Sequence, residues 1–200
     1  MSRKLAPFAI AYDFDGTLAP GNMQEHTFLP SLKIPAAEFW AHANQIAKDN
    51  DMDEILAYMQ LSLDEARRRD LPIRRSDFEQ YGSGITFFKG VESWFVRINA
   101  YAAELGVKTE HYIISSGLRE FISGTPIAEY FTNIYASGYR YDANGVAVWP
   151  ALAINYTNKT QYLFRINKGI SNSYDNTLIN KYLPEEERPV PFRQMIYIGD

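Results

Sequence analysis

The chain has 200 residues, enough for one domain or for a core with a modest insertion. Hydrophobic residues make up 46% and charged residues 22%, as in a globular protein with a substantial core. The formal net charge of -4 gives no general affinity for nucleic acid or an anionic membrane, and no segment reaches the length of a membrane span. The lack of cysteine excludes disulfides, zinc-thiolate sites and cysteine nucleophiles, and only 3 histidines disfavour a histidine-rich metal site.

The first predicted strand is a short apolar run at residues 8–12, and two aspartates, Asp13 and Asp15, follow it directly. In open α/β sheets, ligands bind at the carboxyl ends of the strands. Two neighbouring carboxylates repel each other, so this arrangement favours a bound cation, and Mg2+ is a hard cation that prefers oxygen ligands. Gly16 then allows a tight turn. The alternative to a cation site is that Asp13, Asp15 and Gly16 form an ordinary turn after the strand, because turns use the same residue types.

Residues 19–86 show helical periodicity in place of strand patterns. One helix is predicted after Pro35, with the apolar face Ala36, Phe39, Trp40, Ala43, Ile46 and Ala47. Asp53 is predicted to begin a second helix, and the capping-box patterns Ser62-x-x-Glu65 and Ser76-x-x-Glu79 predict two more. We therefore expect a helical module at residues 19–87, inserted into a core formed by residues 1–18 and 88–200.

After the insertion, the pattern predicts alternating helices and strands. A helix is expected from Val91 to Gly106, and a buried strand at residues 112–114 ends at Ser115-Ser116-Gly117. Asn144-Gly145, between two β-rich runs, predicts a hairpin. Helices are predicted at residues 159–166 and 174–182, followed by a last buried strand at residues 195–198. The whole pattern predicts an α/β fold with a mainly parallel sheet.

The stretch Asp13-Phe14-Asp15-Gly16-Thr17-Leu18 resembles the first motif of the haloacid dehalogenase (HAD) superfamily of phosphohydrolases, Asp-x-Asp-Gly-Thr-Leu or Val. The resemblance implies a Rossmann-like parallel sheet with a helical cap domain inserted after the first strand. The β-hairpin excursion is similar to that of the phosphoserine-phosphatase-like branch. The activity implied is that of a Mg2+-dependent phosphatase acting through an aspartyl-phosphate.

The resemblance also implies roles for individual residues. Asp13 would be the nucleophile, and Asp15 would act first as general acid and then as general base. Thr17 would hold the motif loop. Ser115 matches the second motif, which binds a phosphoryl oxygen, and the backbone N–H groups of Ser116 and Gly117 would assist it.

The third motif is a lysine that neutralises the nucleophile and the phosphate. Lys159, at a predicted helix start, is the best match, and Lys168 and Lys181 are its competitors. The fourth motif is acidic, and Asp200 would supply its first acid. The implied Mg2+ ligands are thus Asp13, the Asp15 carbonyl and Asp200. Because the sequence stops within this motif, we expect a truncated form or a fragment, with weak metal binding and reduced turnover.

Substrate choice is expected to lie in the cap, which would exclude large polymers and favour a small phosphorylated metabolite. Arg67-Arg68-Arg69 and Arg74-Arg75 could meet an anionic substrate, or could be solvated cations near a helix C-terminus. Glu25 and His26, at the expected cap entrance, could touch substrate or simply lie on the surface.

Several alternatives stay open at this point. A phosphomutase or phosphotransferase would use the same residues, and a binding module on a phosphatase scaffold would need none of the chemistry. Dehalogenases typically lack an acid at the position of Asp15, and P-type ATPases carry a lysine at that of Phe14. We expect a cytoplasmic protein, because Pro7 interrupts an N-terminal run that otherwise resembles a signal peptide. The sequence does not indicate the oligomeric state.

Overall fold

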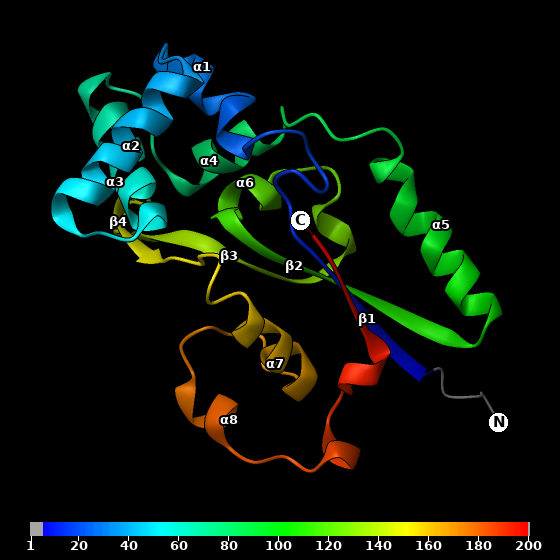
Figure 1. Cartoon of the computed structure of the whole chain (residues 1–200). Coiled ribbons are helices and arrows are strands. Elements are labelled where there is room, and N and C mark those ends of the chain that lie inside the picture. The colour runs from blue at the N-terminus through cyan, green and yellow to red at the C-terminus, as the bar shows by residue number, and fades with distance from the viewer. Residues whose placement is uncertain (1–5, 200) are drawn as a thin grey trace.

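The computed structural model describes residues 6–199, whose strands form one five-stranded sheet in the order β4-β3-β2-β1-β5 (Figure 1). The strands are β1 (Ala6–Tyr12), β2 (Val107–Leu118), β3 (Phe131–Tyr141), β4 (Ala147–Leu152) and β5 (Met195–Ile198). All neighbouring pairs are parallel except β3 and β4. The predicted fold class, a mainly parallel α/β sheet with an inserted helical module and a hairpin, is confirmed.

The central strand β1 positions the first motif. Tyr12, the last residue of β1, is paired with Ile113 of β2 on one side and with Ile198 of β5 on the other. The Asp13 N–H donates to the Ile198 carbonyl at 2.8 Å. Asp13 therefore begins its loop at the carboxyl edge of the sheet, between the parallel strands β2 and β5.

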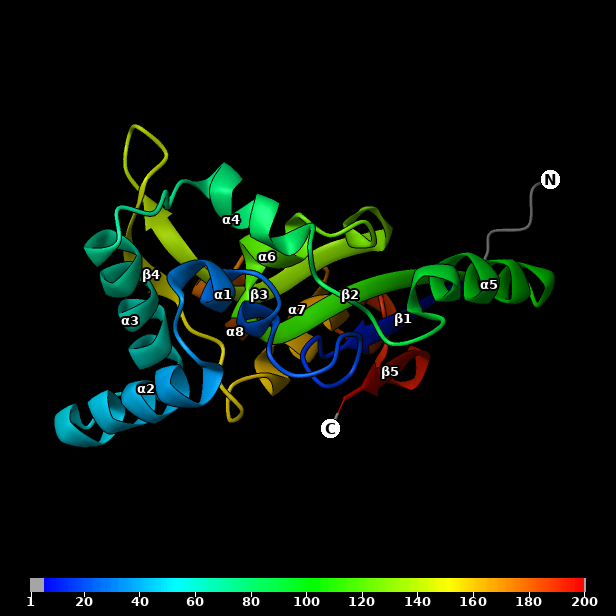
Figure 2. The ribbon, with the colours of Figure 1, turned by 90° about the horizontal axis from the view of Figure 1, so that it is seen from above.

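The two faces of the sheet carry separate hydrophobic clusters, because alternate side chains of a strand point to opposite faces. Ile10 and Tyr12 belong to the larger cluster, together with residues of α5 (Val91–Glu104) and of the insertion. Ala9 and Ala11 belong to the smaller one, under α7 (Thr160–Lys168). Figures 1 and 2 show α5 and α7 on opposite sides of the sheet.

The insertion between β1 and α5 is helical, as predicted. It contains α1 (Phe28–Leu32), α2 (Ala36–Asn50), α3 (Glu54–Arg68) and α4 (Arg75–Gly82), after a short 3-10 helix, Met23–Glu25. Its two ends lie side by side, because the Phe88 N–H donates to the Leu18 carbonyl at 3.0 Å. Phe78 of α4 packs against Phe121 of α6 (Arg119–Ser123), so the insertion shares a core with the sheet. The division at residues 18 and 88 stays a prediction.

The helix starts of the insertion were predicted with mixed success. Asp53 caps α3 as predicted, since its carboxylate accepts the N–H groups of Ile55 (2.9 Å) and Leu56 (3.1 Å). The helix start predicted at Ser62 is wrong, because Ser62 lies inside α3. Its hydroxyl donates to the Tyr58 carbonyl, one turn earlier, at 2.8 Å. The sequence pattern alone does not distinguish a serine that caps a helix from one inside a helix whose hydroxyl donates to the carbonyl four residues earlier.

The start of α4 was predicted two residues too late. The residue that caps the helix is Arg74 instead of Ser76, and α4 begins at Arg75. The carboxylate of Asp77 accepts the Arg74 N–H at 2.7 Å, so the side chain that reaches back to the helix start is Asp77, and Glu79 does not have this role.

The C-terminal half contains the predicted hairpin and one wrong burial prediction. Gly145 closes the β3–β4 turn with φ of 73°, a conformation that favours glycine. The strand predicted to be buried at residues 195–198 forms, but as the exposed edge strand β5, where Ile196 is 48% exposed. The predicted helix at residues 174–182 is shorter, α8 (Asn176–Asn180), and three further 3-10 helices lie at Ala128–Tyr130, Glu185–Glu187 and Phe192–Gln194.

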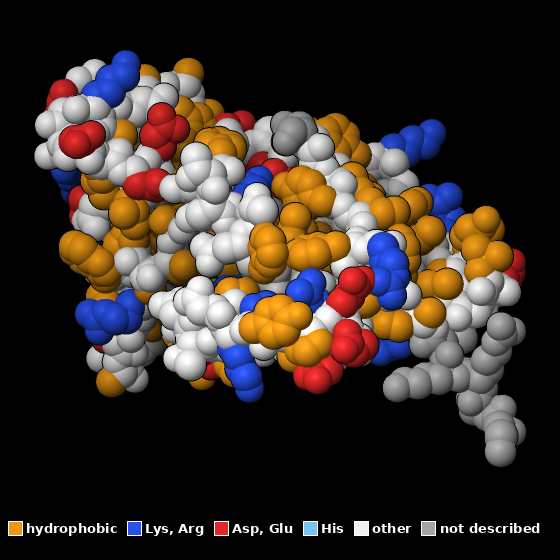
Figure 3. Space-filling view, turned by 60° about the horizontal axis from the view of Figure 1, so that its bottom comes forward, with side chains coloured by type: hydrophobic (Ala, Val, Ile, Leu, Met, Phe, Trp, Pro, Cys, Tyr) orange, Lys and Arg blue, Asp and Glu red, His pale blue; other side chains and the backbone are white. Residues whose placement is uncertain are grey.

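The side of the molecule drawn in Figure 3 carries hydrophobic side chains with basic and acidic ones between them. Within residues 6–199, none of the helices combines the length and the apolar character that crossing a membrane requires.

Candidate active site

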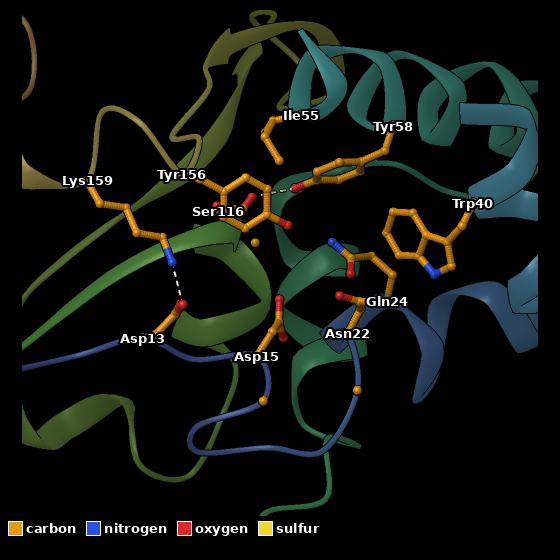
Figure 4. Close-up of a pocket in the computed structure, with 13 residues that line it drawn as sticks. Asp13, Asp15, Asn22, Gln24, Trp40, Ile55, Tyr58, Ser116, Tyr156 and Lys159 are labelled. Atoms are coloured by element: carbon orange, nitrogen blue, oxygen red, sulfur yellow. Dashed lines mark hydrogen bonds and ion pairs between the residues drawn. The ribbon is translucent and has the colours of Figure 1, made fainter. Parts of the chain in front are cut away.

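A cavity of about 310 Å³ opens at the carboxyl edge of the sheet, between the strands and the inserted helices (Figure 4). Two groups of residues line it. The sheet side contributes Asp13, Asp15, Gly16, Ser116, Gly117, Tyr156 and Lys159, and the insertion contributes Gly21, Asn22, Gln24, Trp40, Ile55 and Tyr58.

Asp13 is held from two directions. Its side chain is buried, with 6% of the residue exposed. One carboxylate oxygen, Oδ1, accepts the N–H of Phe14 at 2.8 Å. The other, Oδ2, forms an ion pair with Lys159 Nζ (Figure 4). Lys159 comes from the residue just before α7, which packs on the face of the sheet below Asp13. The ion pair therefore holds the Asp13 carboxylate at the wall of the cavity.

Of the three candidate lysines, the structure brings Lys159 to Asp13. Lys168 lies at the far end of α7, where its ammonium donates to the carbonyls of Ile179 and Lys181, at 2.6 Å each. Lys181 is exposed and does not line the cavity.

Asp15 lies on the side of the cavity that faces the insertion. Its Oδ1 accepts the Met23 N–H at 2.8 Å, which fixes the carboxyl against the first turn of the insertion. Burial raises the pKa of Asp15 to about 7, and the charge of Asp13 adds to the rise, while the Met23 N–H and Lys159 oppose it. A carboxyl group with this pKa can both hold and release a proton near neutral pH.

The second-motif residues form the part of the wall supplied by β2. Ser115 is fully buried beneath the cavity, and its hydroxyl accepts the Gly117 N–H at 3.0 Å. Ser116 and Gly117 line the cavity, and Ser116 Oγ is buried without a hydrogen-bond partner in the described chain. A Cβ at position 117 would lie 2.1 Å from Met23 Cε, so a larger residue there would require the Met23 side chain to move. The phosphate-binding roles predicted for all three stay predictions.

Thr17 does not line the cavity. Its N–H donates to the Phe14 carbonyl at 3.3 Å and closes the turn that follows Asp13. Its predicted place in the substrate site therefore stays a prediction.

The predicted metal site has two described ligands. Asp13 and the carbonyl of Asp15 are at the cavity, whereas Asp200 lies outside the described residues. No group of three or more acidic or histidine side chains between residues 6 and 199 is arranged to hold a metal ion. The donors present fit Mg2+ in kind, since they are oxygen atoms and Mg2+ usually keeps several water ligands. The Mg2+ site stays a prediction.

The arginines of the insertion are bound to other parts of the chain. Arg68 and Arg69 form ion pairs with Glu65, and Arg75 pairs with Glu120 at 3.5 Å. None of the arginines at residues 67–69 and 74–75 lines the cavity. They bind neighbouring parts of the chain, so nothing at the cavity supports the substrate-contact interpretation.

Glu25 and His26 do not line the cavity either. The Glu25 carboxylate accepts the Trp40 indole N–H at 2.7 Å and the Asn22 amide at 2.8 Å. A ring nitrogen of His26, Nε2, lies 2.9 Å from the Pro20 carbonyl oxygen. Both residues support the chain at the entrance of the insertion.

The sequence analysis missed most of the insertion side of the cavity. Trp40 was predicted as part of a helical core face, and Gln24, Ile55 and Tyr58 were not considered as site residues. Tyr156, 75% exposed at the cavity mouth, was missed as well. Periodicity identifies the inward face of a helix, but it does not distinguish a residue that packs in the core from one that lines a cavity.

Comparisons with known proteins find one similar sequence and several similar structures. No protein-family model matches the sequence. An uncharacterized protein of Borreliella burgdorferi is 28% identical over 220 residues, which cover 96% of this chain and 74% of that protein. A HAD family hydrolase from Salmonella enterica serovar Typhi has a similar structure, with a TM-score of 0.58 and 17% identity over 84% of this chain and 54% of that one.

A probable phosphoserine phosphatase from Vibrio cholerae is also similar in structure, with a TM-score of 0.52 and 8% identity over 95% of this chain and 57% of that one. The chain thus spans little more than half the length of these two solved structures. At these identities the comparison shows the fold alone, and that fold is the one of the HAD hydrolases.

Proposed function

We propose that the protein is a hydrolase of small phosphomonoesters that acts through an aspartyl-phosphate on Asp13. The observation that carries this proposal is the ion pair between Lys159 and Asp13 at the wall of the cavity, with Asp15 beside it. A nucleophile, a proton donor and a cation are what transfer of a phosphoryl group from an alcohol requires. The HAD fold and the order of the motifs support the same chemistry.

In the first step, an oxygen of the Asp13 carboxylate attacks phosphorus, and the bond from phosphorus to the alcohol oxygen breaks. The departing oxygen takes a proton from Asp15, which becomes a carboxylate. Lys159 offsets the negative charge of the phosphoryl oxygens as Asp13 loses its own charge. The alcohol then leaves the cavity.

In the second step, a water molecule gives a proton to Asp15 and attacks phosphorus, and the bond from phosphorus to Asp13 breaks. The products are phosphate and the original Asp13 carboxylate, with Asp15 protonated again. Mg2+, held by Asp13, the Asp15 carbonyl and Asp200, would supply further positive charge against the phosphate.

The test is phosphate release from a panel of phosphomonoesters, measured with Mg2+ and with a chelator, on the natural chain and on Asp13→Asn. We expect Mg2+-dependent release that falls by at least about a thousandfold in the variant, because an amide is not a nucleophile at phosphorus. The matched control is Asp51→Asn at the exposed end of α2, which should release phosphate at the natural rate. Release that persists in Asp13→Asn would remove the nucleophile and with it the proposal.

A further inference from the structure

The part of the cavity that would receive the leaving group carries no charge. Among the described residues that line it, the charged ones are Asp13, Asp15 and Lys159, all on the sheet side. A phosphate placed at these three residues directs the rest of the substrate toward the insertion side (Figure 4). A charged group buried there would lose its hydration without gaining a partner.

Two aromatic residues of the insertion, Trp40 and Tyr58, line the cavity. Their polar atoms are already bonded within the protein, so their rings are what they offer to a ligand. The Trp40 indole N–H donates to Glu25, and the Tyr58 hydroxyl donates to the Ser116 carbonyl at 2.8 Å. The two rings lie edge to face, with centroids 5.6 Å apart. Fixed ring surfaces of this kind favour a flat, unsaturated ligand group.

Gln24 provides the one buried side-chain polar atom on this side that is left without a hydrogen-bond partner in the described chain. The residue is 1% exposed, yet it lines the cavity, and its carboxamide oxygen Oε1 has no hydrogen-bond partner. Burial raises the pKa of Tyr58, and a hydrogen bond from Gln24 opposes this rise. Only the amide nitrogen of Gln24 can donate that bond, so the amide oxygen Oε1 is not used in it. A buried acceptor without a partner is unfavourable, so a ligand donor fits this position.

We propose that the leaving group of the substrate is an uncharged alcohol with a flat ring and an N–H or O–H donor on the edge of that ring, as in a nucleoside. Gln24 would select the donor, and Trp40 and Tyr58 would select the ring. This proposal rests on the phosphatase activity proposed above. O-Phosphoserine does not fit, because its leaving group carries an ammonium and a carboxylate that the insertion side cannot pair.

The test compares phosphate release from the ribonucleoside monophosphates, a hexose monophosphate and O-phosphoserine by the natural chain with Mg2+. We expect kcat/KM for at least one ribonucleoside monophosphate to exceed both other values by about tenfold or more. If O-phosphoserine or the hexose monophosphate reacts equally well, the substrate proposal is overturned and the phosphatase proposal stands.

A binding measurement separates the two proposals if no substrate is hydrolysed. The ribonucleosides, without phosphate, are titrated against the tryptophan fluorescence of the natural chain and of Trp40→Phe. Quenching that depends on Trp40 supports the leaving-group site independently of catalysis. If no ribonucleoside changes the fluorescence and no monophosphate reacts, the leaving-group proposal is overturned together with the phosphatase.

Gln24→Met tests the hydrogen bond itself. Methionine has a similar length but offers only a weak acceptor, so kcat/KM for the preferred substrate should fall about tenfold, mainly through KM, with the hexose monophosphate unaffected. Gln45→Met, at an exposed position on α2, is the matched control and should change neither value. An equal loss for both substrates in Gln24→Met would show a structural role and overturn the assignment of Gln24.

Discussion

The two sides of the cavity differ in how the chain builds them. The sheet side is charged, and its Asp13, Asp15 and Lys159 come from loops at strand and helix ends. The insertion side is uncharged, and its residues come from α2, α3, a 3-10 helix and the loop that precedes this 3-10 helix. In the proposed function, residues at strand ends would carry out the reaction, whereas residues of the inserted helices would select the substrate. A protein built this way can change its substrate without changing its chemistry.

The largest expected effect that would sharpen this comparison is the loss of the sheet-side cation. Lys159→Met keeps most of the aliphatic length but leaves Asp13 and the phosphate without a positive partner. We expect kcat to fall by about 100- to 1,000-fold with little change in substrate preference across the panel. Steady-state kinetics on the natural chain and the variant give both quantities.

The matched control is Lys181→Met, which changes an exposed lysine outside the cavity and should leave kcat within about twofold of the natural value. A variant at position 159 that turns over normally would refute the role given to Lys159. A change of substrate preference in that variant would show that the two sides do not act separately.

The sequence indicated the three charged residues of the sheet side, because each stands next to a local signal. Asp13 and Asp15 follow an apolar run directly, and Lys159 precedes a helix, so each could be placed without knowledge of distant contacts. Parallel strands then bring their carboxyl ends together by topology alone. The ion pair between Asp13 and Lys159 joins residues far apart in sequence, and it was the resemblance to the third motif of the HAD superfamily that pointed to Lys159.

The second expected effect concerns the support beneath the sheet side. His111 is 2% exposed, and its ring lies between the Tyr12 hydroxyl (3.0 Å) and Asn99 Oδ1 (2.8 Å). Burial lowers the pKa of His111 from 6.5 to about 4. Between these two pH values the unfolded chain binds more protons than the folded chain, so the free energy of unfolding falls as the pH falls from 6.5 toward 4. The loss is about 1–3 kcal/mol.

His111→Asn removes this contribution, so its destabilisation relative to the natural chain should be larger at pH 7.5 than at pH 4.5, by about the same 1–3 kcal/mol. Urea unfolding at the two pH values measures the difference. The matched control is His42→Asn, an exposed position on α2 that should destabilise equally little at both. A destabilisation in His111→Asn that is the same at both pH values would mean that His111 titrates normally in the folded chain.

The insertion side and the edge of the sheet could not be predicted, for a physical reason. Trp40 and Tyr58 have the spacing of core residues, and only the packing of α2 and α3 decides that their rings face a cavity. Gln24 carries no signal at all, because a lone glutamine in a polar loop is ordinary. β5 was expected to be buried because its residues are apolar, but burial depends on its place in the sheet. Each of these features depends on long-range contacts instead of on local pattern.

The smallest expected effect lies on the insertion side, at the residue that holds Trp40. Glu25→Gln keeps the shape of the side chain but replaces a charged acceptor of the Trp40 N–H with a neutral one. Hydrogen bonds to charged groups are stronger, so the ring should be held less firmly. We expect KM for the preferred substrate to rise about two- to threefold while kcat is unchanged, because the sheet side is untouched.

Glu38→Gln, an exposed position on the first turn of α2, provides the control and should leave KM as it is in the natural chain. The contrast between KM and kcat in Glu25→Gln is what distinguishes two roles for this carboxylate. Its charge also contributes to the raised pKa of Asp15, after burial and the charge of Asp13. If kcat changes and KM does not, Glu25 acts on the proton donor of the sheet side, and the separation between reacting and choosing groups fails at this residue.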